Sequence, residues 1–388
     1  MKKIILIILC LCFIPVTATY AKNETRLEKE DYYVKQIEND VKKALIMNKH
    51  KISLKSYKIK VSDYPDLTYL TRYIPYLNKD IKLTLYAKNG YYYEMKINNN
   101  FSLSKTKKHV KNVDYKIKEL LNVISLKNSD EKNALLLHDY IVSHYEYDEK
   151  MNANSYYLYG MLENKKGVCQ SYAFLYKYIL NKIGMDCYVI NSQSMNHAWN
   201  IVKIDNYYYH VDLCKDDPVK DNLGVVLHDY FLLSDQALKK KGYKNRNKTE
   251  LICSNKKYDS YYFRNVHSPI VIMGNDYYFI KDRFLVLGDK KGNIKKYIEH
   301  VGYWNKDNKS YYKNSYSGLF LRNLILYFNT CEGVYTYNLL NKKIICKFKN
   351  KGPNKIHGIR ECNNMLEICR KSSVNKPSII SKINFLSL

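Results

Sequence analysis

The stretch from Cys169 to Asp212 restricts the fold more than any other part of the chain. A helix is expected to begin near Cys169 and to end at Gly184, since glycine suits the position just after a helix. Strand-like runs follow at 186–191, 197–204 and 207–213. Only Asp205-Asn206 separates the last two runs, which is typical of a tight hairpin. A helix followed by an antiparallel set of strands indicates an α+β fold.

The composition excludes several classes of protein. Hydrophobic residues are 46% and charged residues 26% of the 388, a balance that rules out a wholly disordered chain. The 14 glycines and 7 prolines rule out a collagen-like or Pro-rich architecture. No apolar run of about 18 residues exists beyond the N-terminus, which excludes a multi-pass membrane protein. The length suggests two or three domains.

The N-terminal segment 1–21 is typical of a secretory signal peptide. Lys2 and Lys3 precede the apolar run Ile4–Phe13, Pro15 ends it, and small residues offer cleavage after Ala21. An uncleaved anchor is the alternative, but the run is short for a membrane span. We therefore expect a secreted protein, either extracellular or associated with the cell wall.

The chain is strongly basic, with 64 Lys and Arg against 37 Asp and Glu and a net charge of +27. The charges are mostly dispersed lysines and no nucleic-acid motif occurs, so we expect no nucleic-acid partner. Attraction to an anionic wall polymer is the favoured interpretation. The alternative is a compositional bias with no partner behind it. The oligomeric state is not predicted.

The segments on either side of the central one have patterns of their own. Segment 22–127 reads as an N-terminal α+β region, and 128–255 as the central domain, with a helix capped by Ser129 or Asp130. The elements expected in the N-terminal region are a helix at 31–47, a strand at 52–61, a hairpin at 81–97 turning at Asn89-Gly90, and a helix at 113–124.

The C-terminal segment 262–388 is expected to be all β. Short aromatic strands recur at Tyr277 and Leu324, about 48 residues apart, and more weakly near Met365, as blade-like repeats do. A closed propeller needs at least four blades. An open sandwich or an incomplete propeller-like fan is therefore expected.

The cysteines do not define a disulfide scaffold. Eight remain after cleavage at Ala21 and none forms a CxxC pair, so a zinc ribbon has no support. Cys331 with Cys346, and Cys362 with Cys369, could form local bridges, or these could be free buried thiols.

Cys169 has the position of a nucleophile. The free N–H groups and the dipole at a helix N-terminus favour an anion, which lowers a thiol pKa, especially beside an imidazolium. If Asp205-Asn206 is a two-residue turn, Asp212 shares a sheet face with His197, so a carboxylate can hold one imidazole nitrogen while the other faces the thiol. His210 lies on this face too, as a rival base or a neighbour. A metal site would use Cys169, His197, Asp212 and either His210 or Cys214, but no close ligand pair favours it.

The combination of motifs resembles the transglutaminase-like superfamily. The resemblance covers about 130 to 235. It rests on Cys169, His197-Ala198-Trp199-Asn200, Tyr208-Tyr209-His210-Val211-Asp212 and Asp216-Asp217-Pro218, with His138-Asp139-Tyr140, Tyr147-Asp148 and Tyr159-Gly160-Met161-Leu162 upstream and Tyr230-Phe231-Leu232 downstream. Two places depart from the family pattern, because Cys214 and Lys215 replace the usual Thr and Trp.

The resemblance implies a papain-like core, in which a helix bearing the nucleophile packs on an antiparallel sheet. It further implies that Cys169 is the nucleophile, His197 the base and acid, and Asp212 the orienting carboxylate. Such an enzyme attacks an amide through a thioester, as a peptidase or a protein-crosslinking acyltransferase, on a protein or peptide substrate such as a cell-wall peptide. No Trp precedes Cys169, so the oxyanion donors would be its own N–H and an unidentified group, for which Gln170 is a candidate.

No Asp-rich calcium loop occurs, and neither a metal nor another cofactor is expected. The alternative function is a catalytically inactive transglutaminase-like scaffold that binds cell wall or protein.

Overall fold

The computed structural model describes residues 26–62, 68–217, 224–244, 251–302, 318–372 and 378–387. The predicted signal peptide, 1–21, lies outside these ranges. Among the helices within them, none combines the length and the apolar character needed to cross a membrane.

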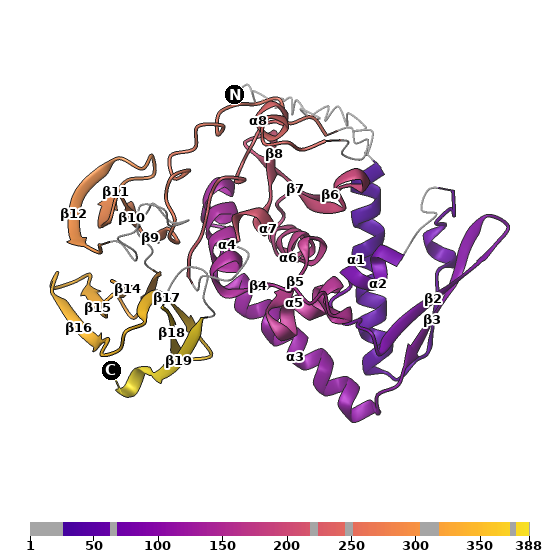
Figure 1. Cartoon of the computed structure of the whole chain (residues 1–388). Coiled ribbons are helices and arrows are strands. Elements are labelled where there is room, and N and C mark those ends of the chain that lie inside the picture. Colours follow the sequence, from indigo (N-terminus) through magenta and orange to yellow (C-terminus); the bar gives the residue numbers. More distant parts are fainter. Residues whose placement is uncertain are drawn as a thin grey trace, which may run out of the picture.

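The centre of the molecule is one helix packed on a three-stranded sheet, labelled α6, β6, β7 and β8 in Figure 1. Their bounds are α6 Cys169–Lys182, β6 Cys187–Ser192, β7 His197–Ile204 and β8 Tyr207–Val211. Both hairpin strands run antiparallel, with Asn200 opposite Val211 and Ile204 opposite Tyr207. Asp205 has a positive φ of 49° and Asn206 one of 68°, as a two-residue type I′ turn requires. The predicted α+β fold and hairpin register are therefore confirmed.

The sheet is covered on both faces. One face packs on α6 through residues such as Val202, and Asn200 Nδ2 donates to the Ala173 carbonyl of that helix at 2.9 Å. The other face contributes Trp199 to a second buried cluster, which includes Leu238 of α8 (Asp235–Lys240). A shift of β7 by one residue would move each of its side chains to the opposite face. Because both faces are buried, the register of this strand is therefore fixed.

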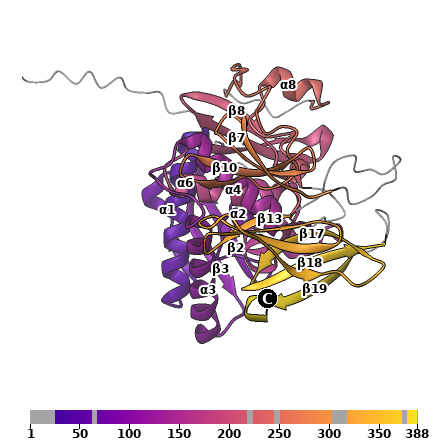
Figure 2. The same ribbon diagram turned by 90° about the vertical axis from the view of Figure 1, so that its left-hand side faces the viewer.

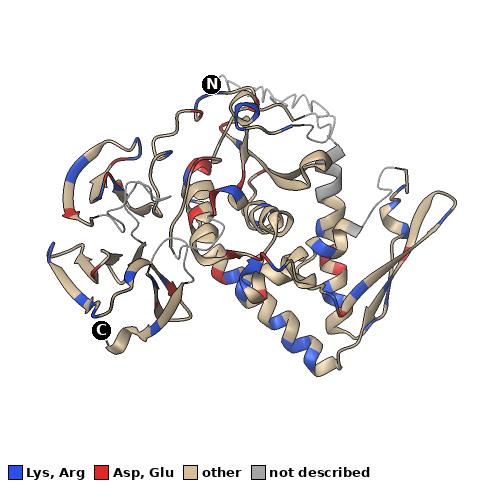
Figure 3. Cartoon of the chain, in the orientation of Figure 1, with Lys and Arg blue, Asp and Glu red and all other residues tan. Residues whose placement is uncertain are grey.

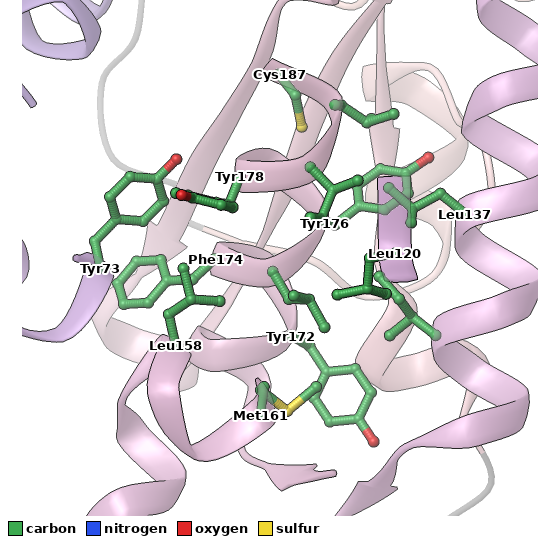
Figure 4. Packing of buried hydrophobic residues seen from close by; sticks show 14 of the residues in the cluster. Tyr73, Leu120, Leu137, Leu158, Met161, Tyr172, Phe174, Tyr176, Tyr178 and Cys187 are labelled. Carbon is green, nitrogen blue, oxygen red and sulfur yellow. The ribbon is translucent and has the colours of Figure 1, made fainter. Parts of the chain in front are cut away.

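Other helices surround α6 and bury its aromatic side chains (Figure 4). Their bounds are α1 Arg26–Ile46, α2 Thr68–Tyr73, α3 Leu103–Leu121, α4 Asp130–His144, α5 Leu158–Asn164 and the single turn α7 Leu213–Asp216. Ser129 caps α4 by accepting from the Lys132 N–H, as predicted. Tyr178 of α6 donates to Glu38 of α1 at 2.7 Å. One hydrophobic cluster therefore runs from α1 through α6, and the predicted division at 127/128 stays a prediction.

The N-terminal region confirms the predicted hairpin, whose strands are β2 Ile81–Lys88 and β3 Tyr91–Asn99. The predicted strand at 52–61 is wrong. Within this segment only the short strand β1, Lys51–Ser53, pairs with β3. The chain then makes a 3₁₀ turn, and Lys58 takes a left-handed φ of 50°, which ends the strand. The predicted helix at 113–124 is only the second half of α3, since Ser102 caps that helix earlier. The basic stretch before it is thus helical.

The C-terminal region is built almost entirely of strands, as predicted, in three antiparallel sheets that follow one another along the chain (Figures 1 and 2). The first holds β9 Val271–Met273, β10 Asp276–Lys281, β11 Phe284–Gly288 and β12 Ile294–His300. The second holds β13 Leu319–Arg322, β14 Ile325–Asn329, β15 Gly333–Asn338 and β16 Ile344–Lys349. The third holds β17 Lys355–Cys362, β18 Met365–Lys371 and β19 Ile379–Asn384.

Strand β17 joins the C-terminal sheets to the central part of the molecule. Arg360 on β17 donates to Glu146 at 2.8 Å and to Glu367 at 2.7 Å. Glu146 belongs to β4 (Glu146–Tyr147), which pairs in parallel with β5 (Lys166–Gly167) just before Cys169. The C-terminal sheets are thus tied to the strand pair that leads into the nucleophile helix.

Neither predicted local disulfide, Cys331–Cys346 or Cys362–Cys369, is present, and Cys331, Cys346 and Cys362 are free thiols. The strand register explains this, since Cys346 lies opposite Tyr335 and Cys362 lies opposite Met365.

Candidate active site

Cys169 is the first residue of α6, and its neighbours fix the helix start. The Val168 N–H donates to Ser171 Oγ at 3.0 Å, and the Ser171 hydroxyl donates to the Ser155 carbonyl at 2.7 Å. A Cβ added at Gly167 would lie 2.2 Å from Ser171 Oγ and 2.3 Å from Met161 Sδ. Glycine is therefore needed here for the approach to the helix, and Cys169 is held at a site that favours an anion.

The three predicted site residues come together. His197 begins β7, and Asp212 caps α7, which follows β8. His197 Nε2 lies 2.6 Å from Asp212 Oδ2, and the Cys169 thiol is hydrogen-bonded to the imidazole of His197. One imidazole nitrogen therefore serves the carboxylate and leaves the other to the thiol, which is the arrangement of a nucleophile, a base and an orienting acid.

The electrostatics of the group favour a charged pair. Burial opposes protonation of His197, but hydrogen bonds to Asp212 and Cys169 outweigh it and raise its pKa to about 9. Burial also opposes ionisation of Cys169, yet the contact with His197 and the Ala198 N–H lower the pKa of the thiol. Near neutral pH these opposite shifts favour a thiolate beside an imidazolium.

Asp212 has further partners that the sequence analysis missed. Its Oδ1 accepts from the Lys215 N–H at 3.2 Å, and its Oδ2 accepts from the Tyr243 hydroxyl as well as from His197. The Tyr243 ring also meets the His197 ring edge-on, with centroids 6.0 Å apart. The chain has 41 tyrosines, and Tyr243 lies 31 positions beyond Asp212, so no local sequence pattern links it to the site.

His210 is a neighbour of the site and not a rival base. Its Nδ1 accepts from the Trp199 indole N–H at 3.0 Å, and its Nε2 lies 2.9 Å from Asp235 Oδ1. Trp199 in turn stacks on His197, with ring centroids 5.9 Å apart and planes 18° apart. His210 therefore holds the indole that lies against the imidazole of the site.

Three groups, namely the Cys169 N–H, Gln170 and Tyr147, bear on the oxyanion donor. The Cys169 N–H lies in the first turn of α6, where backbone N–H groups lack helical partners. Gln170 Oε1 faces Arg72, 3.5 Å away. Tyr147 lies opposite Gly167 in the β4–β5 pair. Burial is the main cause that raises the pKa of Tyr147 to about 12, so its hydroxyl keeps its proton and is a further candidate donor.

The departures from the family pattern leave this geometry in place. Cys214 is buried, and burial raises the pKa of its thiol well above the ordinary value, which makes it a poor nucleophile. Asp217 accepts a hydrogen bond from the Tyr172 hydroxyl of α6, whereas Pro218 lies outside the described residues.

Metal-type ligand atoms gather elsewhere in the described part of the chain. Two groups each bring three such atoms within 4.8 Å, namely His138 with Asp139 and His228, and His210 with Asp235 and Cys253. Neither group contains Cys169, His197 or Asp212.

The region of this site is similar to a known protein family. Residues 118–213 match the family model of the transglutaminase-like superfamily, a range that includes Cys169, His197 and Asp212. No curated protein matches the chain.

Similarity to solved structures is low. A TGase is 19% identical with a TM-score of 0.24, over 34% of this chain and 43% of that one. A candidate cysteine protease from Cytophaga hutchinsonii is 11% identical with a TM-score of 0.23, over 35% and 62%. A computationally designed protein is 9% identical with a TM-score of 0.21, over 48% and 86%. The chain thus spans less than two thirds of the first two proteins.

Proposed function

Residues 118–213 belong to the transglutaminase-like superfamily, and from this premise we propose that the protein is an exported thiol enzyme that attacks peptide amides. Members of the superfamily are generally cysteine-dependent enzymes. In this proposal Cys169 is the nucleophile, His197 the base and acid, and Asp212 the orienting carboxylate. One observation carries it, namely a thiol at a helix N-terminus hydrogen-bonded to an imidazole whose Nε2 lies 2.6 Å from a buried carboxylate.

The proposed reaction has two halves. The Cys169 thiolate attacks the amide carbonyl carbon, and the developing oxyanion is stabilised by the Cys169 N–H and by Tyr147. The imidazolium of His197 then protonates the leaving amine, the C–N bond breaks, and a thioester remains. His197, now neutral, takes a proton from water or from a lysine amine, which attacks the thioester and releases Cys169. Water gives hydrolysis, and an amine gives a crosslink.

The proposed setting is outside the cell or at its wall, where a peptide or protein would be the substrate. Segment 1–21 supports export, and the charge of +27 supports retention by an anionic wall polymer. Exposed lysines gather on α3, among them Lys107, Lys108 and Lys111 (Figure 3). Such a surface would concentrate the enzyme near polyanions in a salt-dependent way.

The test is an assay of both product types in one reaction. The mature protein is incubated with a glutamine-containing peptide library and a fluorescent primary amine, and mass spectrometry records cleavage, deamidation and amine incorporation. Wild type should yield at least one of these products. Cys169→Ala should yield none, whereas Cys346→Ala, which removes an exposed thiol of the C-terminal region, should match wild type.

Product formation by Cys169→Ala at the wild-type rate would contradict the proposal. A comparison of amine incorporation with water attack then assigns the acceptor, since the two compete for one thioester.

A further inference from the structure

A second group of histidines and carboxylates lies in the interior, outside the thiol site. His138 Nδ1 lies 2.9 Å from Asp139 Oδ1, and His138 Nε2 lies 3.2 Å from Asp216 Oδ2. His228 Nε2 lies 3.0 Å from the same Asp139 oxygen, and His228 Nδ1 lies 3.0 Å from the Val266 carbonyl. The side chains of His138, Asp216 and His228 are 0% exposed and that of Asp139 is 5% exposed. We call these four residues the buried network.

The hydrogen-bond partners bear on the charge of the buried network. Both nitrogens of His138 face carboxylate oxygens, and both nitrogens of His228 face oxygen acceptors. A His138 ring that donates to both of its carboxylates is an imidazolium. Burial opposes protonation of His138, but hydrogen bonds to Asp139 and Asp216 raise its pKa to about 9. A buried charge is tolerated only when it is paired in this way.

The remaining oxygens of the carboxylates are also occupied. Asp139 Oδ2 accepts from the Ile270 N–H at 2.7 Å, and Asp216 accepts from the Tyr230 N–H at 2.9 and 3.1 Å. Burial raises the pKa of Asp216, while its bonds to His138 and the Tyr230 N–H counter that shift. Arg264 donates to the backbone carbonyls of His228 and Tyr258, beside the buried network.

The buried network is connected to the thiol site by a single helical turn. Asp216 is the last residue of α7, and Asp212 is its cap. The Asp216 N–H donates to the Asp212 carbonyl at 3.2 Å, and Asp212 Oδ1 accepts from Lys215. Because α7 spans only Leu213–Asp216, a displacement of Asp216 moves Asp212, whose other oxygen holds His197.

We propose that His138 is a positioning residue, which through its contact with Asp216 orients α7 so that Asp212 faces His197. The inference deepens the proposed function and rests on it. His138 acts from α4, and the same network holds the backbone at Val266 and Ile270, which leads into the C-terminal sheets. The thiol site and the C-terminal sheets therefore share one electrostatic anchor.

The test compares two substitutions of one residue. Glutamine places its amide where Nε2 was, so His138→Gln keeps a donor for Asp216. Asparagine places its amide where Nδ1 was, so His138→Asn keeps a donor for Asp139 and leaves Asp216 without its side-chain donor. Both remove the cation. The readout is the pH dependence of iodoacetamide alkylation at Cys169, followed by mass spectrometry.

The inference predicts different outcomes for the two variants. His138→Gln should keep the wild-type midpoint, and His138→Asn should raise it by about one pH unit, which makes the reaction about tenfold slower at pH values below both midpoints. Equal profiles in both, with a matching fall in melting temperature, would mean that His138 only stabilises the fold, which contradicts the inference. If His138→Asn does not fold, Asp216→Asn replaces it, since its single amide oxygen keeps an acceptor for the Tyr230 N–H and the hydrogen bond from His138 is lost. The same shift is expected.

A second readout separates this inference from the proposed function. Hydrogen–deuterium exchange of the Lys215 amide reports the Asp212 cap whether or not Cys169 is reactive. Faster exchange in His138→Asn than in His138→Gln supports positioning, and equal exchange opposes it. Zinc chloride titrated into wild type tests the ligand geometry. Tight binding with proton release that His138→Gln abolishes would show a metal bound by the buried network and overturn the inference.

Discussion

Two histidine–carboxylate groups of the molecule, the thiol site and the buried network, differ in what the second imidazole nitrogen meets. At the thiol site, His197 gives one nitrogen to Asp212 and the other to Cys169, and its side chain is 10% exposed. In the buried network, His138 gives both nitrogens to carboxylates and its side chain is 0% exposed. The first arrangement can pass a proton to a bound substrate, whereas the second has no free position for one.

The difference shows why residue types alone do not identify a catalytic histidine. Hydrogen-bonded carboxylates help to raise the pKa of both His138 and His197 to about 9, so the pKa shift does not distinguish the two histidines. What distinguishes them is a partner that titrates and a path to solvent. His197 has Cys169, which is half-buried, while His138 has Asp139 and Asp216 in the interior.

Removing the charge of Asp212 should affect turnover more than stability. Asp212→Asn should lower turnover by about 10³–10⁴-fold, because the amide favours the wrong tautomer of His197. The unfolding free energy of this variant should change far less than that of a variant in the buried network. The check is kcat measured beside urea unfolding. A variant that keeps wild-type turnover would remove Asp212 from the triad.

The largest effect on stability should come from the buried network. Asp139→Ala leaves His138 and His228 without their shared acceptor, so we expect a loss of about 3–5 kcal/mol in unfolding free energy. Asp186→Ala is the matched control, since its ion pair with Lys203 lies at the surface and should contribute about 1 kcal/mol or less. Urea unfolding measures both, and equal losses would contradict the contrast.

Tyr243 offers a smaller perturbation of the thiol site. Tyr243→Phe removes only the hydroxyl that Asp212 Oδ2 accepts, so His197 keeps its partner but the carboxylate is less firmly held. We expect turnover to fall about tenfold, within the range of a hydrogen bond to a charged group. Tyr230→Phe is the control, because the Tyr230 ring lies 5.9 Å from that of Tyr243 at a tilt of 46° but has no described hydrogen bond to Asp212. Equal losses in the two variants would contradict this role.

Stability should fall as the pH rises through the window set by His138. The folded pKa of about 9 for His138 exceeds the ordinary value of 6.5, so its contribution is complete below about pH 6.5 and is lost as the pH rises through 9. The thiol site adds little slope in this range, because the proton that His197 binds on folding is offset by the one that Cys169 releases. Urea unfolding between pH 6 and 9 should therefore show a fall in stability that is about 1.4 kcal/mol per pH unit steeper in wild type than in His138→Gln. Identical slopes would contradict the raised pKa of His138.

Local patterns in the sequence predicted the parts of the site that are close in the chain. Asp205-Asn206 defined the turn, the turn defined the register, and the register put Asp212 on the face of His197. Tyr243 was missed, since the chain folds back over the sheet from 31 residues beyond Asp212. The strand predicted at 52–61 failed because the left-handed Lys58 has no sequence signal as clear as a glycine.

The buried network was visible in the sequence only as the motif His138-Asp139-Tyr140 within the family resemblance. Its meaning depends on Asp216, 78 positions further on, and on His228 and the Val266 carbonyl, which tertiary packing brings together. Periodicity assigns a residue to the interior but does not say which buried polar groups meet there. The network thus required the structure.

The most direct test of the central claim is the rate of Cys169 alkylation as a function of pH, in wild type and in His197→Ala, with the other cysteines mapped by mass spectrometry. A thiolate–imidazolium pair predicts alkylation that persists well below pH 8 in wild type and a midpoint that rises toward about 8.5 in the variant. A midpoint near 8.5 in both proteins, or no reaction at Cys169, would contradict the account.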